Sequence, residues 1–323
     1  MKVAVIGSGK LGQRHLHTWS QMEDVEVVGV IARNQVKLQE VAAKYETIPY
    51  ESLQDLLAKT DVDIIDICTP TYTHGEFIKE AAQAQKHIIC EKPLALNSRE
   101  AKELISICEE NEVHLLVGHT LRFFPEYANA RKQIQDGEIG TPGVIRMSRG
   151  VPYPQANSWY TDDTKSGGLF LDLGVHEFDW LIWTFGDVKR VMAKRVQKED
   201  MEYGLITVRM EDGTIAHIEL SWAETQFRAS YELAGDKGMI TYNYDDSTPI
   251  AFQSRHNREY QLPRTPLKKD PYYRQLEHFI HILSNQTEPI VTSHDALKAI
   301  QLAEAALKSA ETGQPVSLLK GVK

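Results

Sequence analysis

Short apolar runs alternate with amphipathic segments over the first 120 residues of the chain. The apolar runs have the length of β-strands and are Val3–Ile6, Val25–Ile31, Val62–Cys68, His87–Cys90 and His114–Val117. The segments between them repeat apolar residues with helical spacing and are Leu11–Met22, Gln35–Tyr45, Ser52–Ala58, Gly75–Ala84 and Ser98–Glu110. Continuously apolar strands that alternate with helices are typical of a parallel sheet covered on both faces. Residues 1–120 are therefore predicted to form an α/β domain with a doubly wound parallel sheet.

The pattern changes after residue 120. The sequence predicts helices over Pro125–Asp136, Gly174–Phe185, Tyr272–Ser284 and His294–Thr312, a strand at Val144–Arg149, and a strand series from Val188 to about Phe252. Residues 152–168 are irregular. Consecutive strands joined by tight turns pair antiparallel. Residues 121–323 are therefore predicted to form an α+β domain with a large open, mostly antiparallel sheet, and its last helices can pack back on the first domain.

A glycine fingerprint follows the first predicted strand and opens the first predicted helix. Gly7, Gly9 and Gly12 have the spacing GxGxxG, with Lys10 and Leu11 between the last two. The first glycine allows a tight turn, the second lets the backbone approach a pyrophosphate, and the third allows close packing of helix and strand. The helix N-terminus adds positive potential for phosphate groups. These five residues predict a Rossmann domain that binds NAD or NADP; the alternative is a tight turn without a ligand.

Arg33 bears on the choice between the two cofactors. The second predicted strand ends in Ile31-Ala32-Arg33-Asn34, without a carboxylate. A carboxylate there accepts hydrogen bonds from the ribose 2′-hydroxyl of NAD, whereas arginine suits the 2′-phosphate of NADP. The sequence therefore favours NADP over NAD, unless Arg33 is a solvated side chain that accepts either.

Three side chains have the chemistry needed for hydride transfer at a carbon that bears a hydroxyl group. Lys92 follows a buried strand, so we expect it at the carboxyl edge of the sheet, where its ammonium group can stabilise alkoxide character. Asp172 and His176 are four residues apart and share one face if the segment is helical. Imidazole exchanges protons near neutral pH. The alternatives are a solvated lysine, an aspartate that caps a helix and a histidine in the core.

The chain resembles the Gfo/Idh/MocA oxidoreductases, which act on sugars and cyclitols. The shared motifs are the Gly7–Gly12 fingerprint, Thr69-Pro70 with His74, Glu91-Lys92-Pro93, Val117-Gly118-His119 leading to Arg122-Phe123, and Gly167-Gly168 followed by Asp172, Gly174, His176 and Asp179. They cover essentially the whole chain. The resemblance implies that Lys92, Asp172 and His176 are the catalytic residues, with His176 as the acid/base.

The same resemblance implies which residues line the nicotinamide side of the cofactor, namely Thr69, Pro70, His74, Glu91 and Lys92. Two glycines followed by Leu169 stand where many relatives have three glycines. His119 and Leu121 occupy a segment that varies among sugar-specific relatives. Because both differences lie where the substrate is chosen, no particular sugar follows from the resemblance.

Four residues are candidates for contact with a substrate. His119 belongs to the variable segment, and Arg122 can meet a substrate hydroxyl or phosphate group or pair with a local carboxylate. Tyr153 and Trp159 lie in an aromatic and polar stretch that suits stacking on a sugar ring. The alternative for this stretch is an ordered surface loop.

The composition is that of a globular protein and argues against nucleic-acid-binding and membrane-spanning classes. Hydrophobic residues make up 42% and charged residues 25%, as in ordinary globular proteins. The formal charge of −9 argues against nucleic-acid binding, and no apolar run approaches the roughly 20 residues of a membrane-spanning helix. Cys68, Cys90 and Cys108 suit a reducing cytoplasm, where they pack as small apolar groups. The spacing of the histidines and cysteines predicts no metal site.

These features predict a cytoplasmic NAD(P)-dependent oxidoreductase for a sugar, cyclitol or sugar derivative. In oxidation His176 accepts the hydroxyl proton and Lys92 stabilises the developing charge. An open sheet with one bare face also predicts a homodimer or homotetramer. Two alternatives are a non-catalytic NAD(P)-responsive regulator, and an enzyme that uses tightly bound NAD for a redox-neutral elimination or glycoside cleavage.

Overall fold

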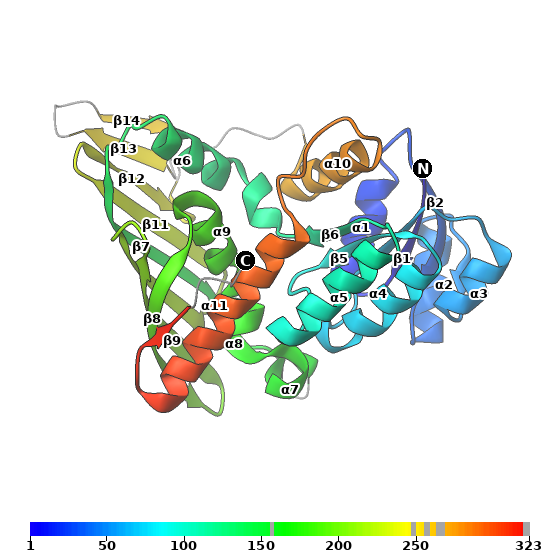
Figure 1. Cartoon of the computed structure of the whole chain (residues 1–323). Helices are drawn as coiled ribbons and strands as arrows, with labels where there is room; N and C mark the ends of the chain where they lie inside the picture. The colour runs from blue at the N-terminus through cyan, green and yellow to red at the C-terminus, as the bar shows by residue number, and fades with distance from the viewer. Residues whose placement is uncertain (156–157, 247–249, 255–258, 263–268, 319–323) are drawn as a thin grey trace. The chain divides into compact units, whose positions relative to one another are not determined.

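The computed structural model describes residues 1–155, 158–246, 250–254, 259–262 and 269–318 of the chain (Figure 1). The chain forms two compact units. The first contains residues 1–123 and 269–297, and the second contains residues 124–268 and 298–323. The chain thus returns to the first unit after residue 268, in a stretch that includes helix α10 (Pro271–Leu283).

The first unit is built on a six-stranded sheet with the order β3-β2-β1-β4-β5-β6, in which all neighbours are parallel. Its strands are β1 (Lys2–Ile6), β2 (Glu26–Ile31), β3 (Pro49–Tyr50), β4 (Ile64–Ile67), β5 (His87–Glu91) and β6 (Leu115–Gly118). The connecting helices are α1 (Lys10–Trp19), α2 (Gln35–Lys44), α3 (Leu53–Lys59), α4 (His74–Gln83) and α5 (Ser98–Glu110), with short 3₁₀ helices η1 (Thr71–Thr73) and η2 (Thr120–Phe123). The predicted doubly wound parallel sheet is confirmed.

Continuous burial of the strands explains their unbroken apolar pattern. Val5 of β1 and Ile89 of β5 are fully buried, and Trp19, Leu38 and Phe279 pack against the same core from helices α1, α2 and α10. Such packing on both faces of a parallel sheet requires apolar residues in succession rather than in alternation. The carboxyl ends of the strands therefore meet at one edge of the sheet, where motif residues of several strands come together.

The second unit is built on a nine-stranded sheet among the described residues, with the order β14-β13-β12-β11-β7-β10-β9-β8-β15. Its strands are β7 (Pro142–Val151), β8 (Val188–Lys198), β9 (Met201–Met210), β10 (Ile215–Trp222), β11 (Arg228–Gly235), β12 (Gly238–Asn243), β13 (Ile250–Ser254), β14 (Glu259–Leu262) and β15 (Val316–Ser317). Strand β7 lies between β10 and β11 and runs parallel to β10, whereas the other neighbours are antiparallel. The expectation of a mostly antiparallel sheet is confirmed.

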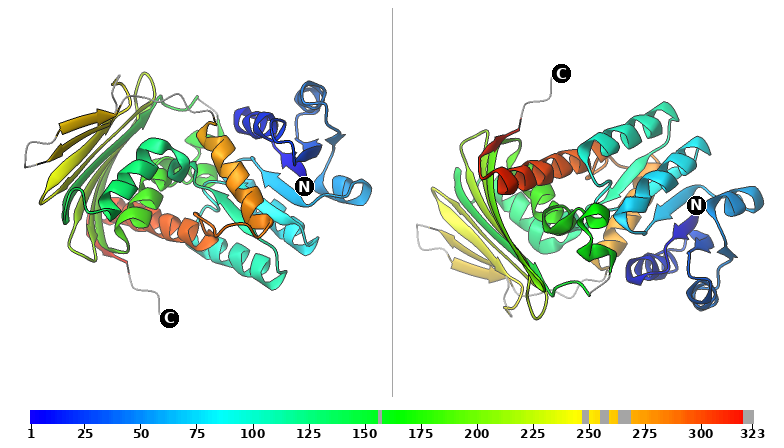
Figure 2. Two further views of the ribbon diagram at one scale, coloured as in Figure 1. Left: turned by 90° about the horizontal axis from the view of Figure 1, so that it is seen from above. Right: turned by 90° about the horizontal axis from the view of Figure 1, so that it is seen from below.

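Helices cover one face of this sheet (Figure 2). They are α6 (Pro125–Gln135), α8 (Gly168–Asp172), α9 (Val175–Phe185) and the later part of α11 (Ser293–Thr312). The 3₁₀ helix η3 (Trp159–Thr161) and the short helix α7 (Asp163–Ser166) pack against α8. Tyr127 of α6 and Trp180 of α9 pack edge-to-face at 5.5 Å, and Trp180 stacks on Tyr231 of β11 at 5.8 Å. On β9 the buried Ile206 and Val208 alternate with the exposed Leu205 and Arg209, as expected for a sheet with one covered face.

None of the helices in the described part of the chain combines the length and apolar character needed to cross a membrane.

Candidate functional site

The glycine fingerprint forms an open cradle between β1 and α1. Gly7 has a φ of +126°, which favours glycine, and a Cβ on Gly12 would lie 1.9 Å from the carbonyl oxygen of Gly7. Gly9 caps α1 without a side-chain hydrogen bond, and a Cβ built on it would meet nothing within 4 Å. Lys10 is exposed and Leu11 half-buried beside it. The N-terminus of α1 therefore offers backbone N–H groups and open space to a pyrophosphate.

Arg33 lies just after β2 at the same edge of the sheet. Its side chain is exposed, and Nη1 lies 3.4 Å from the hydroxyl of Tyr72 in η1. Asn34 caps α2 by accepting a hydrogen bond from the amide of Lys37. Because Asn34 is occupied by this cap, Arg33 is the residue of this turn whose charged end group faces solvent.

His74 connects two loops that follow strands β4 and β5. Its ring nitrogens lie 2.9 Å from the carbonyl oxygens of Thr69 and Pro93. The side chain is 1% exposed, and burial lowers its pKa. His74 therefore holds together the loops that carry Thr69, Pro70 and Lys92, and its place on the nicotinamide side stays a prediction.

Lys92 stands out in a buried stretch. Of the fully described residues 88–95, it alone is half-buried rather than buried. The preceding Glu91 ends β5 and is 4% exposed, and its Oε2 accepts a hydrogen bond from the Lys92 amide at 3.3 Å. The Lys92 side chain is therefore the part of this strand end that can reach a ligand.

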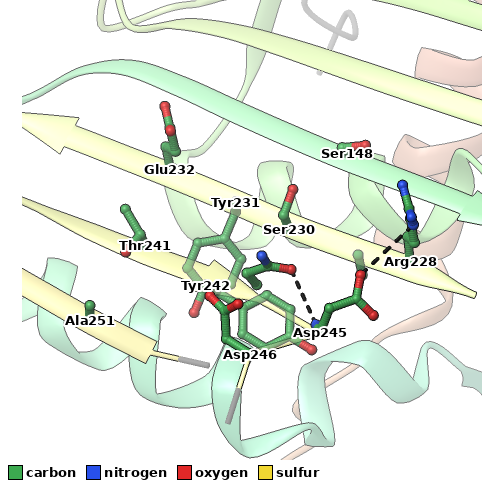
Figure 3. A pocket seen from close by; sticks show the side chains of 12 residues that line it. Ser148, Arg228, Ser230, Tyr231, Glu232, Thr241, Tyr242, Asp245, Asp246 and Ala251 are labelled. Carbon is green, nitrogen blue, oxygen red and sulfur yellow. Dashed lines mark hydrogen bonds and ion pairs between the residues drawn. The ribbon is translucent and has the colours of Figure 1, made fainter. Parts of the chain in front are cut away.

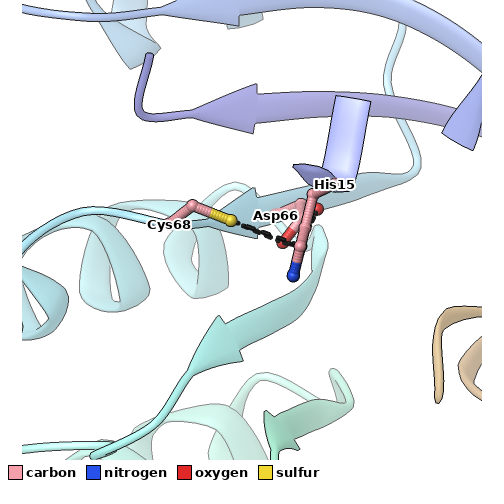
Figure 4. A group of neighbouring side chains, drawn as sticks. All are labelled: His15, Asp66 and Cys68. Atoms are coloured by element: carbon pink, nitrogen blue, oxygen red, sulfur yellow. Dashed lines mark hydrogen bonds and ion pairs between the residues drawn. The ribbon is translucent and has the colours of Figure 1, made fainter. Parts of the chain in front are cut away.

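A polar cluster that the sequence did not reveal includes Glu91 at this strand end; its members His15, Asp66 and Cys68 are drawn in Figure 4. His15 of α1 has Nδ1 2.9 Å from Oδ2 of Asp66 in β4 and Nε2 3.1 Å from Oε1 of Glu91 in β5. The Sγ of Cys68 lies 3.2 Å from Nδ1, and Trp19 donates to Asp66 at 2.7 Å. His15 and Asp66 are fully buried. A histidine 51 residues from one partner and 76 from the other has no spacing signal that sequence reasoning can detect.

The charge state of this cluster follows from its burial. Burial lowers the pKa of His15, but the Asp66 carboxylate and Cys68 together outweigh this effect and raise the pKa well above 6.5. Burial and the same carboxylate raise the pKa of the Cys68 thiol, so that it stays protonated.

His15, Asp66 and Cys68 are close enough to bind a metal ion together. However, the ligand atoms of a tetrahedral zinc ion are about 3.3–3.6 Å apart, whereas Nδ1 lies nearer than this to both partners. Direct hydrogen bonds therefore describe the cluster better than a metal site does.

Asp172 and His176 lie on two short helices in the second unit. The sequence predicts one helix from Gly174, but Asp172 ends α8 and His176 belongs to α9. The hydrogen-bond ladder breaks between them, since the amide of Gly174 donates to Leu169 and that of His176 to Leu173. A Cβ on Gly174 would lie 2.5 Å from the carbonyl oxygen of Phe170. The break therefore depends on a glycine at this position.

The same segment leaves its two predicted reactive residues accessible. Of the fully described residues 168–181, Asp172 and His176 are half-buried and all others are buried. Gly167 and Gly168 both have positive φ values, +76° and +70°, which let the chain turn sharply into α8. The side chains that follow pack into the core, so that the two polar residues are left at its surface.

A buried ion pair anchors α9 next to His176. Nε of Arg149 in β7 donates to Oε1 of Glu177 at 2.6 Å, and Nη2 lies 3.2 Å from the hydroxyl of Tyr127. The side chains of Arg149 and Glu177 are 7% and 1% exposed. Burial lowers the pKa of Arg149, but Glu177 outweighs it and raises this pKa further above its ordinary value. Sequence reasoning missed this pair, because its members lie on a strand and a helix far apart in the chain.

The four candidate substrate residues differ in accessibility. Arg122 is 2% exposed, and its Nη1 donates to the carbonyl oxygen of Ile290 at 2.6 Å and lies 3.2 Å from Asp295. Of the two alternatives for Arg122, the structure thus shows pairing with a local carboxylate. His119 is 1% exposed and lies beneath the surface as well. Both side chains are buried in this structure, and their contact with a substrate stays a prediction.

Tyr153 and Trp159 are half-buried in the second unit. Trp159 begins η3, and its ring stacks on that of Tyr160 at 3.9 Å. The stretch that the sequence left irregular thus contains η3 and α7. A flat aromatic surface of this kind can pack against the apolar face of a sugar ring.

A hollow with a volume of about 520 Å³ lies elsewhere in the second unit, over strands β7, β11 and β12 (Figure 3). Ser230, Thr241, Asp245 and Arg228 are among the residues that line it, and Arg228 pairs with Asp245 at 3.8 Å. It contains none of the predicted site residues.

The three cysteines are free thiols. Cys90 and Cys108 are buried, and Cys68 is half-buried.

Comparisons with known proteins agree with this geometry. Residues 1–119 match the family model described as an oxidoreductase family with an NAD-binding Rossmann fold, and residues 127–241 match the model of the GFO/IDH/MocA C-terminal domain. The uncharacterized oxidoreductase YrbE of Bacillus subtilis is 30% identical over 97% of this chain and 95% of its own length. Myo-inositol 2-dehydrogenase of Thermotoga maritima is 28% identical over 98% of both chains.

A solved structure shares the whole fold. Levoglucosan dehydrogenase in complex with NADH and L-sorbose superposes with a TM-score of 0.90 at 19% identity, over 99% of each chain. Both parts of the chain thus match one family, and a relative at 30% identity spans nearly its full length. This chain belongs to the Gfo/Idh/MocA family of oxidoreductases.

Proposed function

We propose that the protein is an NAD(P)-dependent dehydrogenase that transfers a hydride between the nicotinamide and a hydroxyl-bearing carbon of a sugar, cyclitol or sugar derivative. Its catalytic residues are Lys92, Asp172 and His176. One observation carries the proposal: in two buried stretches, 88–95 and 168–181, the half-buried residues are these three. Folding that buries every neighbour but leaves an ammonium group, a carboxylate and an imidazole accessible favours chemistry at these groups.

The cofactor fits the first unit. Gly7, Gly9 and Gly12 with Lys10 and Leu11 would hold the pyrophosphate. Gly7 and Gly12 allow the tight turn, because a Cβ at either would strike the backbone, and the N-terminus of α1 is open at Gly9. Thr69 and Pro70, held by His74, would face the nicotinamide together with Lys92. When bound, the nicotinamide supplies the acceptor or donor of the hydride.

The three catalytic residues divide the work at the hydroxyl group. In oxidation, the imidazole of His176 accepts the hydroxyl proton and the Asp172 carboxylate orients the imidazole or binds a neighbouring hydroxyl. The Lys92 ammonium group donates a hydrogen bond to the substrate oxygen and stabilises its negative charge as the hydride leaves. In reduction, His176 returns the proton to the oxygen.

A named relative and the aromatic side chains of the second unit both support the substrate class. Myo-inositol 2-dehydrogenase, which is 28% identical to this chain, is named for a cyclitol. Tyr153 and Trp159 offer aromatic surface in the same unit as Asp172 and His176. We therefore propose a polyhydroxylated ring as the substrate, with the hydroxyl groups bound by polar side chains and one ring face on the aromatic surface.

The test of this function is a substrate screen with both cofactors. Purified protein is incubated with myo-inositol, scyllo-inositol and a panel of aldoses in the presence of NAD⁺ or NADP⁺, and absorbance at the reduced-nicotinamide band is followed. We expect reduction of one cofactor with at least one polyol. Cofactor binding without any reduction, over the whole panel and in both directions, would contradict the proposal and favour a regulator.

Arg33 is expected to select NADP. An exposed arginine without a competing carboxylate can pair with the 2′-phosphate, and one such charge-assisted contact is worth about 1.5 kcal/mol, or about tenfold in Kd. Arg33→Ala should therefore raise the Kd of NADPH about tenfold and leave that of NADH within about twofold, as measured by nicotinamide fluorescence. If the unaltered protein binds NADH more tightly than NADPH, or if Arg33→Ala raises the Kd of both cofactors equally, Arg33 does not bind the 2′-phosphate.

We further propose a cytoplasmic homodimer or homotetramer. The bare face of the nine-stranded sheet exposes Leu205 (58%), Ile215 (37%) and Val196 (52%), apolar residues that a second copy of the chain could cover. Light scattering of the purified protein measures the mass of the assembly, and a monomer would exclude this part of the proposal. Three free thiols suit a reducing compartment.

A further inference from the structure

The buried cluster around His15 lies directly behind the proposed reactive lysine. His15, Asp66 and Glu91 come from α1, β4 and β5, and Tyr272 of α10 packs near the imidazole with its ring 6.1 Å away. Burying three ionisable groups is costly unless they pair with one another. Because burying ionisable groups costs free energy, their presence next to the strand end that carries Lys92 points to a functional role beyond packing.

The contacts form a continuous chain from α1 to Lys92. Nδ1 of His15 lies 2.9 Å from Asp66, Nε2 lies 3.1 Å from Oε1 of Glu91, and Oε2 of Glu91 accepts from the Lys92 amide at 3.3 Å. A protonated imidazole donates from both ring nitrogens, so it can hold both carboxyl groups at once. When His15 holds Oε1, the carboxyl group of Glu91 cannot rotate, and its Oε2 stays directed at the backbone amide of Lys92.

The neighbouring strand leaves room for this arrangement. Gly118 of β6 stands beside Glu91 in the sheet register, and a Cβ on Gly118 would lie 2.7 Å from Oε1 of Glu91. The glycine therefore permits the carboxyl group of Glu91 to lie in the sheet between His15 and Lys92. This close approach is independent of the hydrogen bonds of His15.

We propose that His15 is a positioning residue for Lys92: it donates from both ring nitrogens to Asp66 and Glu91 and so fixes the carboxyl group that holds the Lys92 backbone. This inference rests on the proposed function, because it assumes that Lys92 acts on the substrate. His15 itself touches neither substrate nor cofactor. Its removal should lower kcat through a misplaced Lys92, since displacement of a catalytic group by about 1 Å can cost about a hundredfold.

Two variants of His15 separate its two contacts. The side-chain amide of asparagine matches the position of Nδ1, so His15→Asn keeps a donor for Asp66 and loses Glu91. The amide of glutamine matches Nε2, so His15→Gln keeps a donor for Glu91. We expect kcat to fall about 10–100-fold in His15→Asn and about threefold or less in His15→Gln, with NAD(P)H binding unchanged in both. A merely structural role would not rank the two variants in this way.

A double-mutant cycle tests whether the effect passes through Glu91. In a Glu91→Ala background the difference between His15→Asn and His15→Gln should vanish, because the side-chain acceptor that His15 fixes is already lost. Leu16→Val, in the same buried turn of α1, serves as the control for loss of packing and should lower the melting temperature without lowering kcat. Equal kcat values for the two His15 variants, or additive effects in the cycle, would overturn the proposal.

Gly118→Ala keeps the test decisive if the His15 variants do not fold. This change displaces Glu91 from β6 while His15 and Lys92 stay in place, and kcat should fall about tenfold or more. Gly75→Ala is its matched control, because its Cβ would also lie 2.7 Å from a glutamate oxygen, that of Glu100 outside the cluster. Unchanged kcat in Gly118→Ala, or stoichiometric metal in the purified protein, would count against the proposal.

The failure of this inference is distinct from failure of the proposed function. If Lys92→Ala retains turnover, the assignment of Lys92 is wrong. If Lys92→Ala is inactive but folded His15→Asn has the kcat of the unaltered protein, the function stands and the positioning role of His15 is wrong.

Discussion

Replacing Lys92 with alanine is expected to lower kcat by about 10²–10⁴-fold while the protein still folds and binds its cofactor. The reason is that the Lys92 ammonium group is proposed to donate to the substrate oxygen as charge develops on it, and removal of one such donor costs that range. The residue is half-buried at the end of β5 and contributes its amide, which alanine retains, to the contact with Glu91. Initial rates with the substrate found in the screen, together with a fluorescence titration of NAD(P)H, measure both quantities.

Lys102→Ala is the control for this prediction. Lys102 is an exposed lysine of α5 in the same unit and takes no part in the proposed site. Its replacement removes the same charge and should leave kcat within about twofold. Turnover by Lys92→Ala at more than a tenth of the normal rate would remove Lys92 from the mechanism.

Replacing Arg149 with methionine is expected to destabilise the second unit by about 3–5 kcal/mol. The change leaves Glu177 buried without the cation that it now binds at 2.6 Å, and an uncompensated buried carboxylate is costly. The double variant Arg149→Met with Glu177→Leu should recover much of this loss, because both charges are then absent. Urea unfolding followed by circular dichroism gives the free energy of unfolding of each protein.

Strand β7 supplies a matched control for the ion pair. Arg146, three residues before Arg149, pairs with Glu232 at 2.9 Å, but both side chains are at least half exposed. Exposed pairs contribute about 0–1 kcal/mol, so Arg146→Met should change stability little. Equal effects of the two substitutions would show that burial does not determine the strength of the Arg149–Glu177 pair.

Periodicity predicted those parts of the fold that depend on local sequence. The apolar runs of the first unit were recognised because strands buried on both faces cannot alternate, and the cradle because Gly7 and Gly12 have no room for a side chain. Two features were beyond this reasoning. Strand β7 inserts between β10 and β11, and β15 pairs with β8 from the far end of the chain. Both depend on pairing between distant segments, for which a hydrophobic pattern specifies a face but not a partner.

The candidate site shows the same division. Lys92, Asp172 and His176 were predicted from residue type, position and the family resemblance, and the structure leaves all three half-buried in otherwise buried stretches. The break between α8 and α9 was missed, because one glycine in an apolar segment does not reveal that its Cβ would strike the carbonyl oxygen of Phe170. His15 and Glu177 were missed as members of buried pairs, since their partners lie on other elements.

The most direct measurement of the central claim is deuterium transfer from substrate to cofactor. A substrate found in the screen, deuterated at its hydroxyl-bearing carbons, is incubated with oxidised cofactor and the protein, and the nicotinamide is analysed by NMR. The account predicts one deuterium at C4 of the reduced nicotinamide, with its formation lost in Lys92→Ala. Consumption of the substrate with no deuterium in the released cofactor and no net redox change would contradict it and indicate a redox-neutral reaction.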